Sequence, residues 1–121
     1  MIRKLECVCI PTDDIVASEA FYLKLGLTRA WSIERPLAGG EMWTLVGLKF
    51  PEAQSSEMVL SNNSDVRLVE VELLCDDVRQ TFAELHGAAG VEWIREPFAT
   101  ESGHVAVMKA PDGNVFVLVG P

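Results

Sequence analysis

The sequence predicts an α+β fold built from two tandem βαβββ modules. Three observations support this fold: an internal repeat, an Asp-Asp pair at the same place in each copy, and the composition of one globular domain. Of the 121 residues, 49% are hydrophobic and 23% are charged, a balance typical of a soluble globular chain. This length is sufficient for one hydrophobic core. We therefore expect a single domain over residues 1–121, made of module 1–61 and module 66–121.

Each module is expected to begin with a strand that leads into a helix. Residues 7–15 align with residues 70–78, and in both segments an alternating pattern runs into two aspartates and then changes to helical spacing. A short carboxylate at a helix start accepts hydrogen bonds from unpaired backbone amides. The expected helical stripes are Ala17, Phe21 and Leu25 before Gly26, and Val78, Phe82 and Leu85 before Gly87.

Three further strands are expected in each module. In the alignment Trp31 falls on Trp93, which suggests matched packing, and residues 34–36 resemble residues 95–97. The runs 42–48 and 104–108 follow glycines, and residues 58–61 align with 116–119. A turn at Pro111-Asp112-Gly113-Asn114 predicts a hairpin, because proline sets the first φ angle and glycine accepts a positive one.

Charge and cysteine content exclude several functions. The formal net charge of −8 argues against binding nucleic acid, because few basic groups are available to neutralise phosphates. No apolar run is long enough to span a membrane, and the N-terminus does not resemble a secretory signal. Three cysteines in such a chain suggest reduced thiols, so we expect a cytoplasmic protein.

A few side chains are candidates for chemistry. Glu70 and Glu72 share one strand face, which is either the solvent face of a sheet or part of an acidic pocket; there they could act as a general base or bind a cation. Cys7 and Cys9 occupy the equivalent positions in the first module. Trp43 could stack on a planar or cationic ligand, or pack in the core. His104 begins a strand and could contact a ligand or lie at the rim.

The chain resembles the vicinal oxygen chelate family, which includes glyoxalase I, bleomycin-resistance proteins and extradiol dioxygenases. The resemblance rests on residues 10–14, on Phe21-Tyr22 and Leu25-Gly26-Leu27 in the first helix, and on the 111–114 turn. It implies curved mixed sheets around a central cup, with Glu70 and Glu72 directed inward. It also implies a homodimer.

The resemblance further places the metal ligands of the family's enzymes on the first and last strand of each module. The matching positions in this sequence are Cys7, Val59, Glu70 and Val117. Valine binds no cation, and a divalent ion needs about three protein ligands. We therefore expect no metal and no cofactor, unless a shifted register brings in Glu57.

Three functions are compatible with these observations. The first is a metal-free protein that binds a small cationic or amphipathic molecule through Cys7, Cys9, Trp43, Val59, Glu70, Glu72, His104 and Val117. The second is a lyase, isomerase or dioxygenase of the glyoxalase type, with a degenerate metal site or with Glu70 or Glu72 as the catalytic base. The third is a dimeric accessory module whose cup is partly filled by its own side chains.

Overall fold

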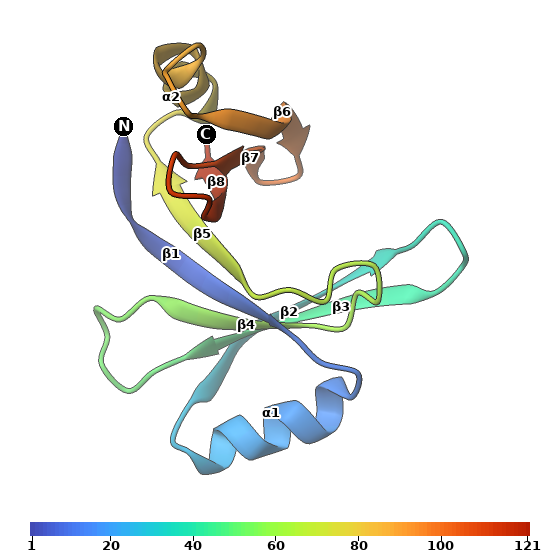
Figure 1. Cartoon of the computed structure of the whole chain (residues 1–121). Helices are drawn as coiled ribbons and strands as arrows, with labels where there is room; N and C mark the ends of the chain where they lie inside the picture. Colours follow the sequence, from blue (N-terminus) through green and yellow to red (C-terminus); the bar gives the residue numbers. More distant parts are fainter. The chain divides into compact units, whose positions relative to one another are not determined.

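A computed structural model describes all 121 residues as two copies of strand, helix, strand, strand, strand (Figure 1). The first copy comprises β1 (Ile2–Pro11), α1 (Ile15–Lys24), β2 (Thr28–Pro36), β3 (Met42–Lys49) and β4 (Glu57–Ser61). The second comprises β5 (Glu70–Cys75), α2 (Val78–Leu85), β6 (Glu92–Thr100), β7 (Gly103–Lys109) and β8 (Val115–Gly120). Neither helix is long and apolar enough to cross a membrane. The α+β fold with two βαβββ modules is confirmed.

The eight strands follow the hydrogen-bonding order β2-β3-β4-β1-β5-β8-β7-β6. In each module the first strand is parallel to the last, because β1 pairs with β4 and β5 pairs with β8 in parallel. The remaining pairs within each module are antiparallel hairpin neighbours. The sheet is therefore mixed, as the sequence predicts. The enclosing cup that the family resemblance implies stays a prediction.

The chain forms two compact units, one of which combines residues from both ends of the sequence. The first-strand unit is Cys7–Val69, and the second-strand unit combines Met1–Glu6 with Glu70–Pro121. The strand β1 is thus divided between the units. Its last five residues pair with β4. Its first residues lie in the same unit as β5, which is the other neighbour of β1 in the sheet. In this unit the backbone amide of Asp76 donates to the carbonyl of Met1.

Both helices begin at the predicted aspartates. The side chain of Asp14 accepts a hydrogen bond from the amide of Ala17, and that of Asp77 accepts one from the amide of Gln80. Each bond is 3.0 Å long and satisfies an amide that has no partner within the helix. The Asp-Asp pairs therefore mark the two helix starts, and the second aspartate of each pair is the cap.

In the first-strand unit, one face of the strands packs against α1. Its buried core is formed by Leu27, Val46, Leu48 and Leu60. From the helix, Ile15 and Tyr22 contact this core, whereas Phe21 and Leu25 are 56% and 60% exposed. The predicted stripe through Phe21 and Leu25 is wrong, because the helix is rotated so that positions one residue away, including Tyr22, face the sheet.

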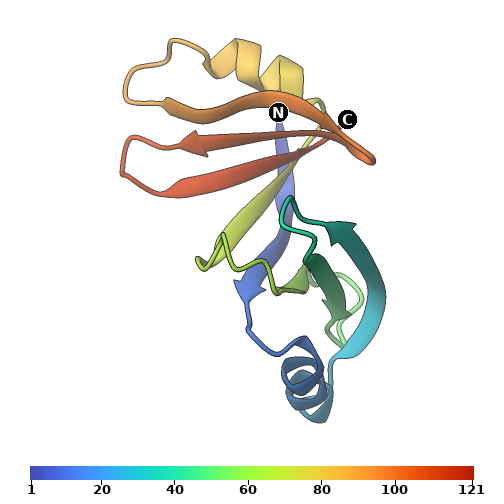
Figure 2. The same ribbon diagram turned by 90° about the vertical axis from the view of Figure 1, so that its right-hand side faces the viewer.

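In the second-strand unit, the strands pack against α2, which runs beside β6 and β7 (Figure 2). The buried core contains Cys75, Val78, Ala106 and Leu118, with Leu73, Trp93 and Met108 packed around it. Val78 is fully buried, as the predicted stripe requires. The hairpin between β7 and β8 is also confirmed, and its turn is closed by hydrogen bonds between Ala110 and both Gly113 and Asn114.

Candidate functional site

Each unit has a sheet face turned away from its helix, which we call the open face. Residues that are paired across neighbouring strands lie on the same face, so the registers identify which residues share it. In the first-strand unit one row across four strands contains Cys9, Val59, Gly47 and Trp31. In the second-strand unit the corresponding row contains Glu72, Val117, Val107 and Arg95. We call these the first row and the second row.

The first row is occupied by one of its own side chains. The indole of Trp31 lies against the backbone of Gly47, where any Cβ atom would overlap the ring. The indole Nε1 donates a 2.9 Å hydrogen bond to Oε1 of Glu57. Cys9 and Val59 continue the row and are 6% and 4% exposed. Glycine at position 47 is therefore required for Trp31 to lie flat and reach Glu57.

Trp43 also lies on the open face of this unit. Its Nε1 donates a 2.8 Å hydrogen bond to Oγ of Ser61, and the guanidinium of Arg35 lies 5.1 Å from its ring centroid. Trp43 and Trp31 both pack against the buried cluster of Cys7, Cys9, Leu45 and Val59. The structure thus brings Cys7, Cys9, Trp43 and Val59 together on one face.

Glu70 and Glu72 lie on the open face of the second-strand unit. Leu73, which alternates with them, packs on the opposite face against the core below α2. Glu72 is in register with Val117, and both glutamates are half-buried. Burial raises the pKa of the Glu70 carboxyl, because water is removed from around its charged form. The structure therefore places Glu70, Glu72 and Val117 on one face of this unit.

Arg95 is a residue of this face that the sequence reasoning missed. Its guanidinium lies 4.2 Å from the ring centroid of Phe98, which is also on the open face through its pairing with Val105. The sequence alignment matched Trp31 with Trp93, but the registers match Trp31 with Arg95. Trp93 instead packs below α2, with its ring centroid 4.8 Å from that of Phe82. The expectation of matched packing for the two tryptophans is wrong.

The mismatch arises from β-bulges. Register shifts occur between Arg29 and Trp31, and on both sides of Arg95 in β6, and each extra residue turns the following side chains to the other face. Aligning Pro36 with Pro97 hides this shift, because Pro36 ends β2 whereas Pro97 lies inside β6. Counting back from the strand ends would have found the match, since Trp31 and Arg95 each lie five residues before the end of their strands.

His104 lies on the other face from the second row. Its neighbours at alternate positions in β7, Ala106 and Met108, pack in the core below α2, and its Nδ1 atom is buried without a hydrogen-bond partner. The structure therefore does not bring His104 together with Glu72 and Val117.

Comparison with known protein families gives a match over residues 4–118. The matching family is described as the Glyoxalase/Bleomycin resistance protein/Dioxygenase superfamily, and the match spans nearly the whole chain. The chain belongs to this superfamily. No curated protein matches the sequence.

Several solved structures are similar to the chain over nearly its whole length. A hypothetical protein from Bacillus halodurans C-125 has a TM-score of 0.74 at 18% identity, with 98% of this chain and 94% of that chain covered. A Streptomyces coelicolor methylmalonyl-CoA epimerase variant, in complex with 2-nitronate-propionyl-CoA, has a TM-score of 0.75 at 17% identity, covering 99% and 95%. Methylmalonyl-CoA epimerase from Mycobacterium tuberculosis has a TM-score of 0.72 at 18% identity, covering 99% and 89%. At these identities the likeness shows a shared fold.

The residues at the superfamily's metal-ligand positions do not fit a divalent metal ion. Val59 and Val117, which stand at two of the four positions, offer no donor atom. Glu57 is in register with Cys7, but its carboxylate already accepts the hydrogen bond from Trp31. No group of three or more His, Cys, Asp or Glu side chains is arranged to hold a metal.

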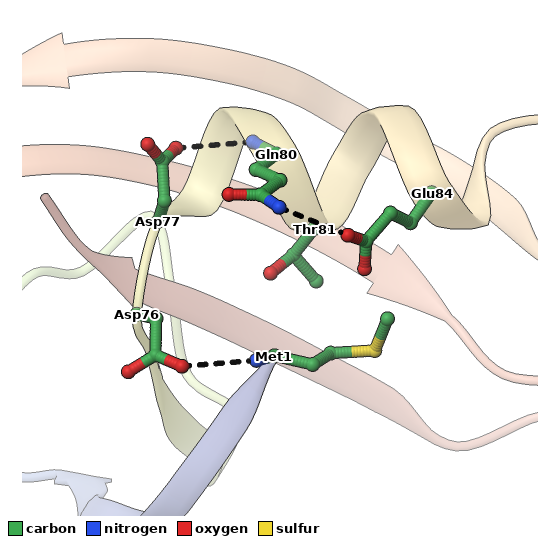
Figure 3. Close-up of a pocket in the computed structure, with 6 residues that line it drawn as sticks. All are labelled: Met1, Asp76, Asp77, Gln80, Thr81 and Glu84. Carbon is green, nitrogen blue, oxygen red and sulfur yellow. Dashed lines mark hydrogen bonds and ion pairs between the residues drawn. The ribbon is translucent and has the colours of Figure 1, made fainter.

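Two pockets are lined by residues that do not belong to either row. One, of about 80 Å³, is lined by Met1, Asp76, Asp77, Gln80, Thr81 and Glu84 (Figure 3). Its carboxylates are engaged within the protein. Asp76 pairs with the Met1 amine and Arg3, Asp77 caps α2, and Glu84 accepts from Gln80. The other, of about 360 Å³, is lined by Pro11, Thr12, Asp13, Asn63 and Arg67, and Arg67 pairs with Asp13 at 2.7 Å. In both pockets, charged side chains of the lining pair within the protein.

Proposed function

We propose that the protein is a metal-independent binding protein of the glyoxalase and bleomycin resistance superfamily. Its ligand is a small cationic or amphipathic molecule held near Glu70 and Glu72. The observation that carries this proposal is the pairing of Glu72 with Val117 in the second row, beside the half-buried Glu70 with its raised pKa. Glu70 and Glu72 are acidic, but Val117 beside them offers no donor atom. The metal enzymes of the superfamily need a complete set of ligands here.

The physical argument concerns the cost of burying a carboxylate. A half-buried carboxylate loses hydration and is stabilised when a cation approaches it. A positively charged group of the ligand would recover part of that cost, and its apolar part would lie on the valines of the same face. The net charge of −8 adds a general attraction for cations.

Replacing Glu70 by glutamine tests the proposal. We expect Glu70→Gln to weaken binding of octylamine, a simple cationic amphiphile, by about 1–3 kcal/mol, the range for loss of a charged hydrogen bond. The measurement is an NMR titration of the labelled protein. Glu92→Gln, an exposed change on β6, is the matched control and should leave binding unchanged. Unaltered octylamine binding by Glu70→Gln would contradict the proposal.

The same variant has an expected pH dependence of stability. Because the folded-state pKa of Glu70 is raised, the stability linked to its neutral form is fully present below about pH 4 and is lost as pH rises through the raised pKa. Glutamine stays neutral at every pH. We therefore expect Glu70→Gln to be as stable as the wild type in acid and slightly more stable at neutral pH, measured by urea unfolding. A variant that is markedly less stable at neutral pH would mean that Glu70 is held by structural partners.

Metal independence has its own test. We expect exhaustive chelation of freshly purified protein to leave the melting temperature unchanged, because a bound metal would have added its binding free energy to the folded state. The measurement is differential scanning calorimetry before and after chelation, with elemental analysis of the same sample. Stoichiometric zinc, nickel, manganese or iron that stabilises the fold would overturn this expectation.

A second candidate function is a glyoxalase-type lyase, isomerase or dioxygenase. The raised pKa of Glu70 favours it, because a carboxylate with a raised pKa is a better general base near neutral pH. Since methylmalonyl-CoA epimerases share this fold, the assay is exchange of the C2 proton of methylmalonyl-CoA in deuterated water. Exchange that is lost in Glu70→Gln would favour the enzyme over the binding protein.

We also propose that the protein forms a homodimer. A dimer would cover apolar side chains that are exposed in the single chain, such as Val16 at 75% and Leu68 at 77%. Light scattering at micromolar concentration should give twice the mass of one chain. A monomer under these conditions would contradict the proposal and remove support from a dimeric accessory module.

A further inference from the structure

We propose that the ligand also carries an anionic group, a carboxylate or a phosphate, which binds to Arg95. The ligand is then a zwitterionic amphiphile, with its cation near Glu70 and Glu72, its apolar body on Val117 and Val107, and its anion at Arg95. This inference rests on the proposed function, because it uses the same open face and adds the opposite end of the ligand.

The second row has oppositely charged side chains at its two ends. Glu72 on β5 pairs with Val117 on β8, Val117 pairs with Val107 on β7, and Val107 pairs with Arg95 on β6. All four side chains therefore leave the same face of the sheet. The row begins with a carboxylate, ends with a guanidinium and has two valines between them. A ligand that matches this order has two opposite charges joined by an apolar segment.

The spacing of the strands limits the length of the ligand. Neighbouring strands lie about 4.8 Å apart, so three steps separate the Cα atoms of Glu72 and Arg95 by roughly 14 Å. Both charged side chains can lean along the row, which shortens the distance between their charges. An extended chain of about eight to ten carbons therefore has a suitable span between its amine and its acid.

Arg95 stacks on an aromatic ring and makes no ion pair within the protein. Three other arginines, Arg3, Arg29 and Arg67, each pair with a carboxylate of the protein. Arg95 instead lies over the ring of Phe98 and makes no ion pair. Stacking on a ring orients a guanidinium while its N–H groups stay available to a carboxylate or phosphate. In a protein with net charge −8, a cation left without an acidic partner on this face is suited to an anionic ligand group.

Comparison of the two rows shows why the second row is the one available to a ligand. In the first row, the position that corresponds to Arg95 is Trp31, and its indole lies on Gly47 and donates to Glu57. That row is filled by an aromatic ring of the protein itself. In the second row Val107 replaces the glycine, and Arg95, which is exposed, replaces the tryptophan.

Two probes of equal chain length test the inference: 8-aminooctanoate and octylamine. Each is titrated into the labelled protein, with dissociation constants from NMR shifts. We expect the wild type to bind 8-aminooctanoate about tenfold more tightly than octylamine, the size of one charge-assisted hydrogen bond. Arg95→Met, which keeps the apolar stem, should remove this tenfold preference and leave octylamine binding unchanged. Arg79→Met, an exposed change on α2, should alter neither.

The outcomes separate this inference from the proposed function. Octylamine binding that depends on Glu70, together with 8-aminooctanoate binding that is no tighter or is unaffected by Arg95→Met, overturns the inference and leaves the proposed function in place. Failure of octylamine and 8-aminooctanoate to bind the wild type overturns both. Spectra of Arg95→Met that keep the wild-type peak dispersion show that the variant is folded. Arg95→Lys should recover part of the preference for 8-aminooctanoate over octylamine, because lysine restores the positive charge without the paired N–H groups of a guanidinium.

Discussion

Replacing Leu118 by alanine is expected to lower the free energy of unfolding by about 2–5 kcal/mol. Leu118 is fully buried in β8 and packs with Cys75, Val78 and Ala106. Removing its side chain loses the transfer free energy of the buried carbons and leaves a cavity that the surrounding strands and α2 fill only in part. Urea unfolding monitored by circular dichroism measures the loss.

The control for Leu118→Ala is Val115→Ala in the same strand. Val115 is 47% exposed, so its truncation should change stability by well under 1 kcal/mol, after allowance for strand propensity. Leu118→Ala should also weaken any ligand bound on the second row, because Val117 is its immediate neighbour. A Leu118→Ala variant with wild-type stability would show that the core below α2 is not packed as described.

Replacing Gly47 by alanine is expected to cost about 1–3 kcal/mol, the usual range for overpacking. A Cβ atom at this position would overlap the indole of Trp31. The backbone of Gly47 does not have a positive φ angle, so the added methyl group itself causes no backbone strain. The indole has to move, and its hydrogen bond to Glu57 is broken. Urea unfolding gives the stability, and tryptophan fluorescence reports the altered surroundings of the ring.

A double-mutant cycle identifies the cause of the Gly47→Ala effect. In a Trp31→Ala background the space is already vacant, so Gly47→Ala should cost much less than in the wild type. Gly39→Ala is a second control, because nothing lies within 4 Å of a Cβ built at that glycine. Equal costs of Gly47→Ala with and without Trp31 would contradict the contact between them.

The repeat and the helix starts could be predicted because they depend on short-range patterns. The aspartates Asp14 and Asp77 cap their helices through bonds to amides three residues on, and the strand alternation of Glu70 and Glu72 follows from local geometry. Such features need no knowledge of long-range packing.

The remaining features depend on small shifts that a single sequence does not reveal. One extra residue at a bulge in β6 turns Trp93 toward α2 and Arg95 toward the open face. A rotation of α1 by about one residue exchanges Phe21 for Tyr22 as the packed aromatic. The hydrogen bond from Trp31 to Glu57 joins residues 26 positions apart and requires the space above Gly47. Each of these depends on the partner strand as well as on the local sequence.

The division of β1 between the two units has a consequence during synthesis of the chain. Residues Cys7–Val69 form one compact unit, whereas Met1–Glu6 belong with residues that are made later, from Glu70 onward. At about 5–20 residues per second, the ribosome needs several seconds to add that later segment. Until that segment is made, Ile2 and Leu5 have no β5 to pair with, and unpaired strand edges are sites at which chains associate wrongly. The first six residues can therefore reach their native pairing only after the second half of the chain has been made.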